Sequence, residues 1–168
     1  MELIVDMQGF IKDGGVICKE LAVGSLQNVL LDHFVFETPP RIRQHSKQNA
    51  WLSQCFHKLR WTDGDIPYDQ IYKIFQRISA GSYVILVKGL EKKRWLEELL
   101  PNGPLVEDLV DFPSLNSTRY FKKPRCAYNH PHCALQNVLK LRDYAITNYG
   151  DYPFVRNESE EDEGFVTA

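Results

Sequence analysis

The run SYVILVKG, residues 82–89, places the tightest constraint on how this chain folds. It is apolar at successive positions, so both of its faces need a buried environment, which is typical of a strand in the middle of a covered sheet. A helix-like segment follows at once over residues 90–100, and Pro101 ends it. The run therefore predicts the central strand of an α/β layered fold.

Three other strand-like runs come before this strand, each rich in β-branched or aromatic residues and bounded by Gly or Pro. They occupy residues 2–10, 14–25 and 29–40, and Gly9 interrupts the first of them. Because only short turns separate the runs, we expect an antiparallel meander. Two consecutive prolines at the end of the third run bring the meander to an end.

Helix-like patterns fill most of the remaining chain. Apolar residues recur at three- and four-residue spacings over residues 46–61, and again from about Pro67 to Gly81. Residues 104–115 combine a short strand with a loop, and a last helix starts near His132. The order is therefore three strands, helices, strand, helix, strand and helix.

This order predicts an α/β fold with a mixed five-stranded sheet, made of the three-strand meander plus two parallel strands and flanked by helices. The chain has 168 residues, which suits one domain, expected over residues 1–150. Residues 151–168 are expected to form an acidic, disordered tail, and five acids lie within residues 157–168. Without those five acids, 17 acidic residues face 20 basic ones. The domain is therefore mildly basic, which permits nucleic-acid binding without demanding it.

The sequence carries no sign of export or of a membrane span. No apolar run approaches the roughly 18 residues that cross a bilayer, and the N-terminal segment lacks the basic start of a signal peptide. The four cysteines are then more typical of thiols or metal ligands than of a disulfide framework. Cys18 and Cys55 lie on apolar faces and are expected in the core. We expect a protein of the cytoplasm or nucleus that is neither secreted nor membrane-bound.

Several polar residues fall at the ends of expected strands and helices, where α/β folds gather ligands. Asp6 lies in the first strand, and Gln8 points to the same side. Glu91 follows the central strand, while His132 and Asn137 belong to the start of the last helix. Structural roles are the alternative: a turn cap for Asp6, a backbone contact for Gln8 and a solvated helix face for Asn137.

Over roughly residues 1–148 the chain resembles the DnaQ-like, or DEDDh, 3′–5′ exonucleases of the ribonuclease H superfamily. VDMQGF, followed by VICKELAV and HFVFETPP, is similar to the first motif of that family. YVILVKG is similar to the strand before the second motif, and HCALQN matches the third in its spacing and its alanine. The resemblance implies a ribonuclease H-like fold with a site at Asp6, Glu91 and His132.

Two of the acids that such an exonuclease uses are replaced by amides here, Gln8 and Asn137. A two-metal nuclease holds its cations with carboxylates, and an amide oxygen brings no negative charge. We therefore expect no two-metal exonuclease activity. The alternative is an atypical ribonuclease or 3′–5′ exonuclease that uses Asp6, Glu91 and His132 with Mg²⁺ or Mn²⁺.

Two cysteines and two histidines lie within eight residues, at Cys126, His130, His132 and Cys133. Short spacings between Cys and His are typical of zinc sites, which need four ligands. If two cysteines and one histidine bind a metal, the fourth ligand could be the second histidine, Glu91 or a distant residue. The alternative is a pair of free thiols near a turn.

A second resemblance favours one of these sets. The Maelstrom domain of the germline small-RNA pathway is similar to a DnaQ-like fold that lost its catalytic residues, and it carries a Glu-Cys-His-Cys metal cluster. Glu91, Cys126, His130 and Cys133 match that order, with His132 as a substitute for His130. The resemblance implies a structural Zn²⁺ and a role in RNA silencing.

Basic residues flank the expected site and could bind the phosphates of RNA, with ordinary solvated loops as the alternative. They are Lys92, Lys93, Arg94, Arg119, Lys122, Lys123 and Arg125. We therefore expect a catalytically degenerate DnaQ-like domain that binds single-stranded or structured RNA or a small-RNA-pathway protein. The other hypotheses are the atypical nuclease and a pure protein-interaction scaffold.

Overall fold

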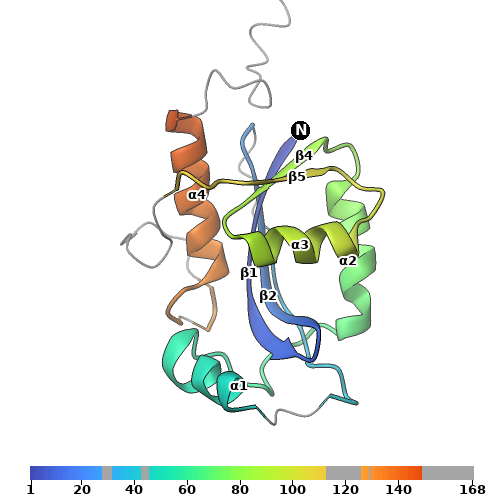
Figure 1. Ribbon diagram of the computed structural model, residues 1–168, viewed down its shortest axis with the longest axis vertical. Helices are drawn as coiled ribbons and strands as arrows, with labels where there is room; N and C mark the ends of the chain where they lie inside the picture. The colour runs from blue at the N-terminus through green and yellow to red at the C-terminus, as the bar shows by residue number, and fades with distance from the viewer. Residues whose placement is uncertain (28–31, 43–45, 113–125, 129, 149–168) are drawn as a thin grey trace, which may run out of the picture.

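The computed structural model describes residues 1–27, 32–42, 46–112, 126–128 and 130–148. Over these residues a mixed sheet lies between helices, with α4 on one face and α2 and α3 on the other (Figure 1). The predicted α/β class is confirmed. The expected acidic tail, residues 151–168, lies outside the described residues.

The sheet has five strands in the order β3-β2-β1-β4-β5. β1 (Glu2–Lys12), β2 (Gly15–Ser25) and β3 (Asp32–Val35) pair antiparallel with their neighbours. β4 (Val84–Val87) runs parallel to β1, and β5 (Leu105–Asp108) runs parallel to β4. This arrangement confirms the predicted meander with two added parallel strands.

Four α-helices and two shorter helical turns complete the described chain. They are α1 (Lys47–Trp51), the π-helical turn η1 (Leu52–Phe56), the 3₁₀ turn η2 (Tyr68–Gln70), α2 (Ile71–Ser79), α3 (Leu90–Leu99) and α4 (Ala134–Asn148). No helix among the described residues is long and apolar enough to cross a membrane.

β4 is buried on both faces, as its sequence predicts. Val84 and Leu86 belong to the apolar core beneath α4, whereas Ile85 and Val87 belong to the core beneath α2 and α3. Because side chains alternate along the strand, β4 contributes residues to two separate apolar cores, one on each face of the sheet. This central strand ties the layers of the domain together.

β1 continues through Gly9, where the sequence pattern indicates an interruption. The pairing register shifts at this point, because β2 carries one extra residue, Lys19, that has no partner on β1. The bulged lysine is fully buried, and its ammonium group donates to the carbonyl oxygens of Trp61, at 2.9 Å, and Asp63. The glycine therefore marks a β-bulge inside a long strand rather than a strand end.

The helix expected over residues 46–61 is shorter than its pattern indicates. α1 passes into η1, and the wider π turn changes the direction in which the following side chains point. Cys55 is consequently exposed, so its predicted place in the core is wrong, whereas Cys18 is buried as expected. Leu59 is also buried, but it reaches the core from the segment after the helix.

The bulge generates a testable prediction at Gly9. A Cβ atom there would lie 2.0 Å from the backbone carbonyl oxygen of Ile17, and backbone cannot move aside as a side chain can. Gly9→Ala should lower the free energy of unfolding by about 1–3 kcal/mol or more, the usual cost of overpacking. Urea denaturation followed by circular dichroism measures the change.

Gly15→Ala is the matched control in the neighbouring strand. The nearest atom to its added Cβ is the flexible Lys12 side chain at 3.5 Å, so a change within about 0.5 kcal/mol is expected. Equal denaturation midpoints for the two variants would show that the close backbone approach at the bulge does not constrain the fold.

Candidate metal centre and the adjoining pocket

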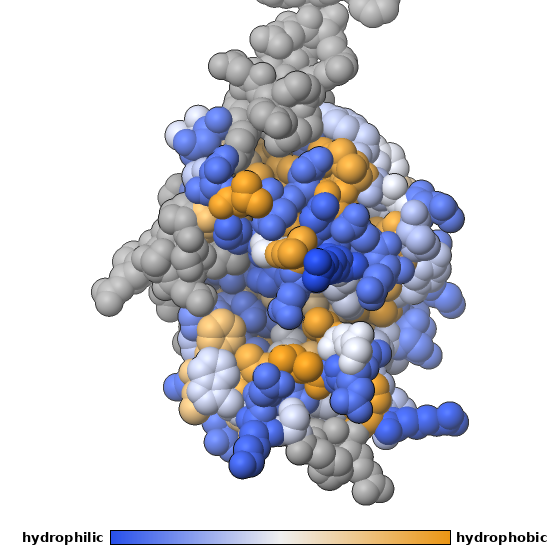
Figure 2. Space-filling view, in the orientation of Figure 1, coloured by the Kyte–Doolittle hydropathy of each residue, from blue (hydrophilic) through white to orange (hydrophobic). Residues whose placement is uncertain are grey.

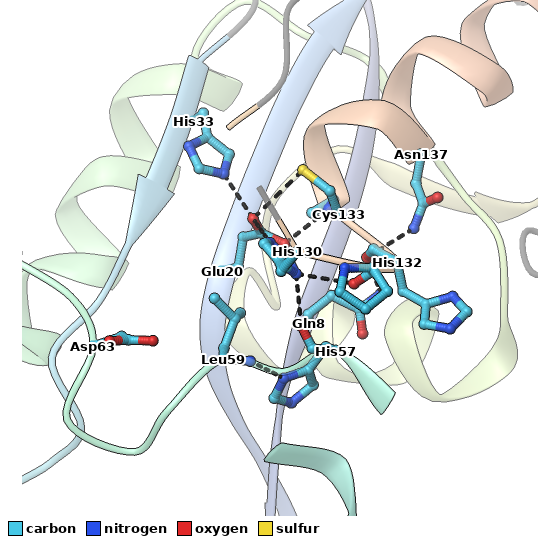
Figure 3. A network of polar contacts seen from close by, with 12 residues as sticks. Gln8, Glu20, His33, His57, Leu59, Asp63, His130, His132, Cys133 and Asn137 are labelled. Atoms are coloured by element: carbon cyan, nitrogen blue, oxygen red, sulfur yellow. Dashed lines mark hydrogen bonds and ion pairs between the residues drawn. The ribbon is translucent and has the colours of Figure 1, made fainter. Parts of the chain in front are cut away.

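Four side chains from two distant parts of the chain converge beside the start of α4. Figure 3 shows three of them, Glu20, His130 and Cys133. Glu20 comes from β2, while Cys126, His130 and Cys133 come from the segment that leads into the helix. Their ligand atoms all lie within 4.8 Å of one another. The carboxylate and both thiols are buried, and the His130 side chain is only 3% exposed. The structure thus brings the Cys/His cluster of the sequence into a group that could hold a metal ion.

The bulge in β2 aims Glu20 at this cluster. Side chains alternate between the two faces of a strand, and one extra residue shifts the alternation. Cys18 therefore packs into the core beneath α2 and α3, while Glu20 and Ala22 face α4. Ala134, the first residue of α4, donates its backbone N–H to Oε1 of the carboxylate at 2.8 Å. Glu20 thereby also satisfies a donor that the helix itself leaves unpaired.

Hydrogen bonds fix the orientation of the His130 ring. Its Nδ1 lies 2.8 Å from the carbonyl oxygen of His57, and its Nε2 lies 2.7 Å from Oε2 of Glu20. Because a carbonyl oxygen only accepts, Nδ1 donates its proton there and Nε2 is presented to the cluster. Metal-binding histidines in proteins are oriented in this way. The His57 ring is itself held between the carbonyl oxygen of Gly9 and the backbone N–H of Leu59.

The charges of the cluster are strongly coupled. Burial acts to raise the pKa of Glu20, but hydrogen bonds from His130 and from His33, at 2.8 Å, bring it down to about 2. The hydrogen bond with Cys133 lowers the pKa of Cys126 to about 4 and raises that of Cys133 itself. Burial acts to lower the pKa of His130, yet Cys126 and Glu20 raise it to about 10. A carboxylate, a thiolate and an imidazolium therefore lie side by side, and a divalent cation that binds here takes the place of the proton on Nε2 of His130.

The donor set fits a small tetrahedral cation. Two sulfur atoms, one imidazole nitrogen and one carboxylate oxygen are compatible with Zn²⁺. Because four protein ligands leave no coordination position for water, a metal held here contributes to stability and not to catalysis.

The fourth member of the cluster differs from the one expected, because Glu20 takes the place foreseen for Glu91. In the sheet β1 separates β2 from β4, so a residue that follows β4 lies on the far side of β1 from the cluster. Glu91 is exposed in the first turn of α3. The missed signal is the Lys-Glu pair inside VICKELAV, since two charged residues within an apolar strand indicate a bulge or a buried site.

His132, the expected substitute ligand, is not a member of the cluster. Its backbone adopts a positive φ of 56°, and its ring stacks on Phe56 with centroids 4.1 Å apart and planes 12° apart. Its carbonyl oxygen accepts a hydrogen bond of 2.8 Å from Nε2 of Gln8. His132 therefore contributes its backbone to one site and its ring to a different surface.

A second polar group surrounds Asp6, which is fully buried in β1. Lys92 forms an ion pair with Oδ1, and Nδ2 of Asn137 donates to Oδ2 at 2.9 Å. Burial raises the pKa of Asp6, while the lysine and the amide act in the opposite direction. Asn137 is 2% exposed, so a solvated helix face is the wrong description of it. One carboxylate, one ammonium group and one amide thus form a charge-balanced set.

A pocket of about 380 Å³ opens beside this set. Its polar lining consists of Gln8, Lys88, Glu91, Lys92 and Asn137. The structure therefore gathers Asp6, Glu91 and both amides in one region. The ring of His132 instead stacks on Phe56, and the ammonium group of Lys92 is paired with the carboxylate of Asp6.

Part of the predicted basic surface lies on α3. Lys92 is directed at Asp6, Lys93 forms an ion pair of 3.8 Å with Glu97, and Arg94 is exposed. The rest of the predicted set lies outside the described residues: Arg119, Lys122, Lys123 and Arg125. Figure 2 shows the area between α3 and α1 as a mixture of hydrophilic and apolar side chains.

The metal cluster and the pocket are neighbours, because His132 lies between two cluster residues while its carbonyl oxygen contacts Gln8. No known protein family, curated protein or solved structure matches this chain. The chemistry of these two sites is therefore the basis on which a function is inferred.

The cluster predicts one bound metal ion per chain. Loss of a residue that only orients a metal ligand lowers metal affinity by about tenfold to hundredfold, and Glu20→Gln and Cys126→Ser should each lower it by at least as much. Each variant should also unfold at a lower temperature than the wild type, because metal binding is coupled to folding. Elemental analysis and thermal unfolding of the purified variants measure both quantities.

Glu91→Gln and Cys55→Ser make the same chemical changes outside the cluster and should keep the metal content of the wild type. Loss of metal in Glu91→Gln, with full metal in Glu20→Gln, would restore the ligand set expected from the sequence.

The Asp6 set predicts a latent cation site. Lys92→Met combined with Gln8→Glu and Asn137→Asp exchanges an ammonium group and two amides for a cluster of carboxylates, the ligands that Mn²⁺ and Mg²⁺ prefer. Added Mn²⁺ should stabilise the triple variant against thermal unfolding. The free energy of unfolding should increase by about 2.7 kcal/mol at a Mn²⁺ concentration 100 times the Kd. The wild type and Lys93→Met, a surface control, should not respond. A folded triple variant that ignores Mn²⁺ would contradict this description of the pocket.

Proposed function

We propose that this protein is a catalytically inactive domain of the DnaQ-like, ribonuclease H-like type, stabilised by one zinc ion, that binds single-stranded RNA. The observation that carries the proposal is the contact between Lys92 and Asp6. Where a nuclease of that type places a divalent cation against its first acid, this chain supplies its own ammonium group.

The order of elements supports the fold type. An antiparallel meander leads into two parallel strands, and the last helix returns to cover the first strands. Asp6 in β1 and Asn137 in α4 meet beneath that helix, in the positions that the resemblance assigns to two catalytic acids. Gln8 and Asn137 keep the size of those acids without their charge.

The cluster of Glu20, Cys126, His130 and Cys133 supports the zinc. The bound ion would join β2 to the segment before α4 and so fix the start of the helix that covers Asp6. The cation would supply charge compensation only, because all four ligands come from the protein.

The pocket supports an RNA ligand through the kinds of group that line it. Lys88 provides positive charge beside the Lys92–Asp6 ion pair and Glu91, the two amides provide hydrogen-bonding groups, and Phe56 and Trp95 provide flat apolar surfaces. Proteins bind single strands by combining a positive groove with aromatic faces on which bases stack. A role in RNA silencing, in the cytoplasm or the nucleus, follows from the similarity to the Maelstrom domain and is part of this proposal.

The salt dependence of RNA affinity tests whether positively charged side chains of the protein bind RNA phosphates. The metal-loaded chain should bind a labelled single-stranded RNA in a fluorescence anisotropy titration, and its affinity should fall steadily as salt rises. Lys88→Gln should weaken binding and reduce the salt slope by about one unit, because one phosphate contact is lost. Lys73→Gln, an exposed change on α2, should leave both quantities unchanged.

The same mixtures test the absence of catalysis. The RNA should remain intact with Mg²⁺ or Mn²⁺, since Lys92 is paired with the carboxylate of Asp6, and Gln8 and Asn137 bring amides instead of the charge that two cations need. Metal-dependent cleavage that disappears in Asp6→Asn would overturn the inactive assignment, and lack of RNA binding even at low salt would overturn the ligand assignment.

A further inference from the structure

Three aromatic rings form a continuous stack beside the pocket. Trp51 stacks on Phe56 with ring centroids 5.6 Å apart and planes 20° apart. Phe56 stacks in turn on His132, at 4.1 Å and 12°. We call this row of rings the aromatic column.

The π turn creates the column. In an α-helix two residues five positions apart point about 140° away from each other, so Trp51 and Phe56 would not meet. Here the backbone N–H of His57 donates to the carbonyl oxygen of Leu52 at 3.0 Å, a bond that spans five residues. The widened turn brings the two rings into one stack, and such turns are frequent at functional sites.

The outer end of the column is open. Trp51 is 54% exposed, an unusual state for so large an apolar side chain. Its neighbours on this surface are polar, since Gln48 and Gln54 are exposed. A flat apolar face bordered by hydrogen-bonding groups suits a planar ring with polar edges better than an aliphatic side chain.

The inner part of the column lies beside a pocket that lysine side chains help to line. Phe56, in the middle of the column, also lines the pocket that contains Lys92. A ligand that stacks on the column is therefore drawn toward cations as well, which favours a ligand with rings and negative charges.

We propose that the exposed face of Trp51 is a stacking site for a base of single-stranded RNA, which continues the aromatic column into the bound strand. The inference rests on the RNA binding proposed above and assigns it a residue outside the basic set. A base supplies the planar ring, and its phosphates supply the charge that the lysines attract.

Trp51→Ala tests the site in the metal-loaded full chain with a single-stranded RNA. Affinity should fall at least about fivefold, the smaller effect of removing one base–aromatic contact. Trp51→Phe keeps a ring and should stay within about threefold of the wild type. Tyr72→Ala removes an aromatic residue of similar exposure, 46%, from α2 and should change nothing.

Two further readings separate stacking from charge and from misfolding. The salt slope of Trp51→Ala should equal that of the wild type, unlike that of Lys88→Gln, because no phosphate contact is lost. An abasic strand of equal length should bind wild type and Trp51→Ala alike, since no base remains to stack. Thermal unfolding of Trp51→Ala should show a folded protein at the temperature of the binding assay, because the side chain is 54% exposed and one ring contact is lost.

The outcomes distinguish the two proposals. Wild-type affinity for RNA in Trp51→Ala would overturn the stacking site and leave RNA binding in place. Equal losses of affinity for normal and abasic strands would also overturn it. Failure of the wild type to bind RNA at low salt would overturn the proposed function and the stacking site together.

Discussion

Asp6 and Glu20 lie buried on the face of the sheet that α4 covers, and groups from several elements compensate their charge. An ionised carboxylate inside a protein costs several kcal/mol unless it is paired and fully hydrogen-bonded. Asp6 receives an ammonium group from α3 and an amide from α4. Glu20 receives two imidazoles and the first N–H of α4. The compensating groups thus come from α3, β3, α4 and the segment before α4.

The two solutions differ, and the difference shapes what the protein can do. At Asp6 the chain supplies the cation itself, so the ammonium group of Lys92 neutralises the carboxylate as soon as the protein folds. At Glu20 the chain adds two thiols and an imidazole, and the carboxylate together with thiols that lose their protons could compensate an external cation. A metal held there by four protein ligands would stabilise the fold, whereas the pocket beside Asp6 opens at the surface.

The sequence predicts the layers of this fold well, because hydrophobic periodicity reports burial directly. The central strand at residues 82–89 and the meander before it are found where their patterns indicate. The gathering of the Cys126, His130 and Cys133 side chains also follows from their spacing. Glu20 could not be found in this way, since a ligand contributed by a distant strand depends on register, and register depends on a bulge that alternation alone does not reveal. The π turn after α1 could not be predicted either, because the spacing of apolar residues was compared with an α-helical period only.

The bulge at Lys19 has a consequence for how this sequence can change over time. Loops usually accept inserted or deleted residues, whereas a strand accepts substitutions as long as its alternation survives. Here a single surplus residue, Lys19, interrupts the alternation. Deleting it would make Cys18 and Glu20 consecutive residues that still point to opposite faces, so both sides of the sheet would keep their residues, but the buried ammonium group that donates to Trp61 and Asp63 would be lost. Among related chains, this point of β2 should therefore accept the loss of the extra residue where another donor satisfies those two carbonyl oxygens.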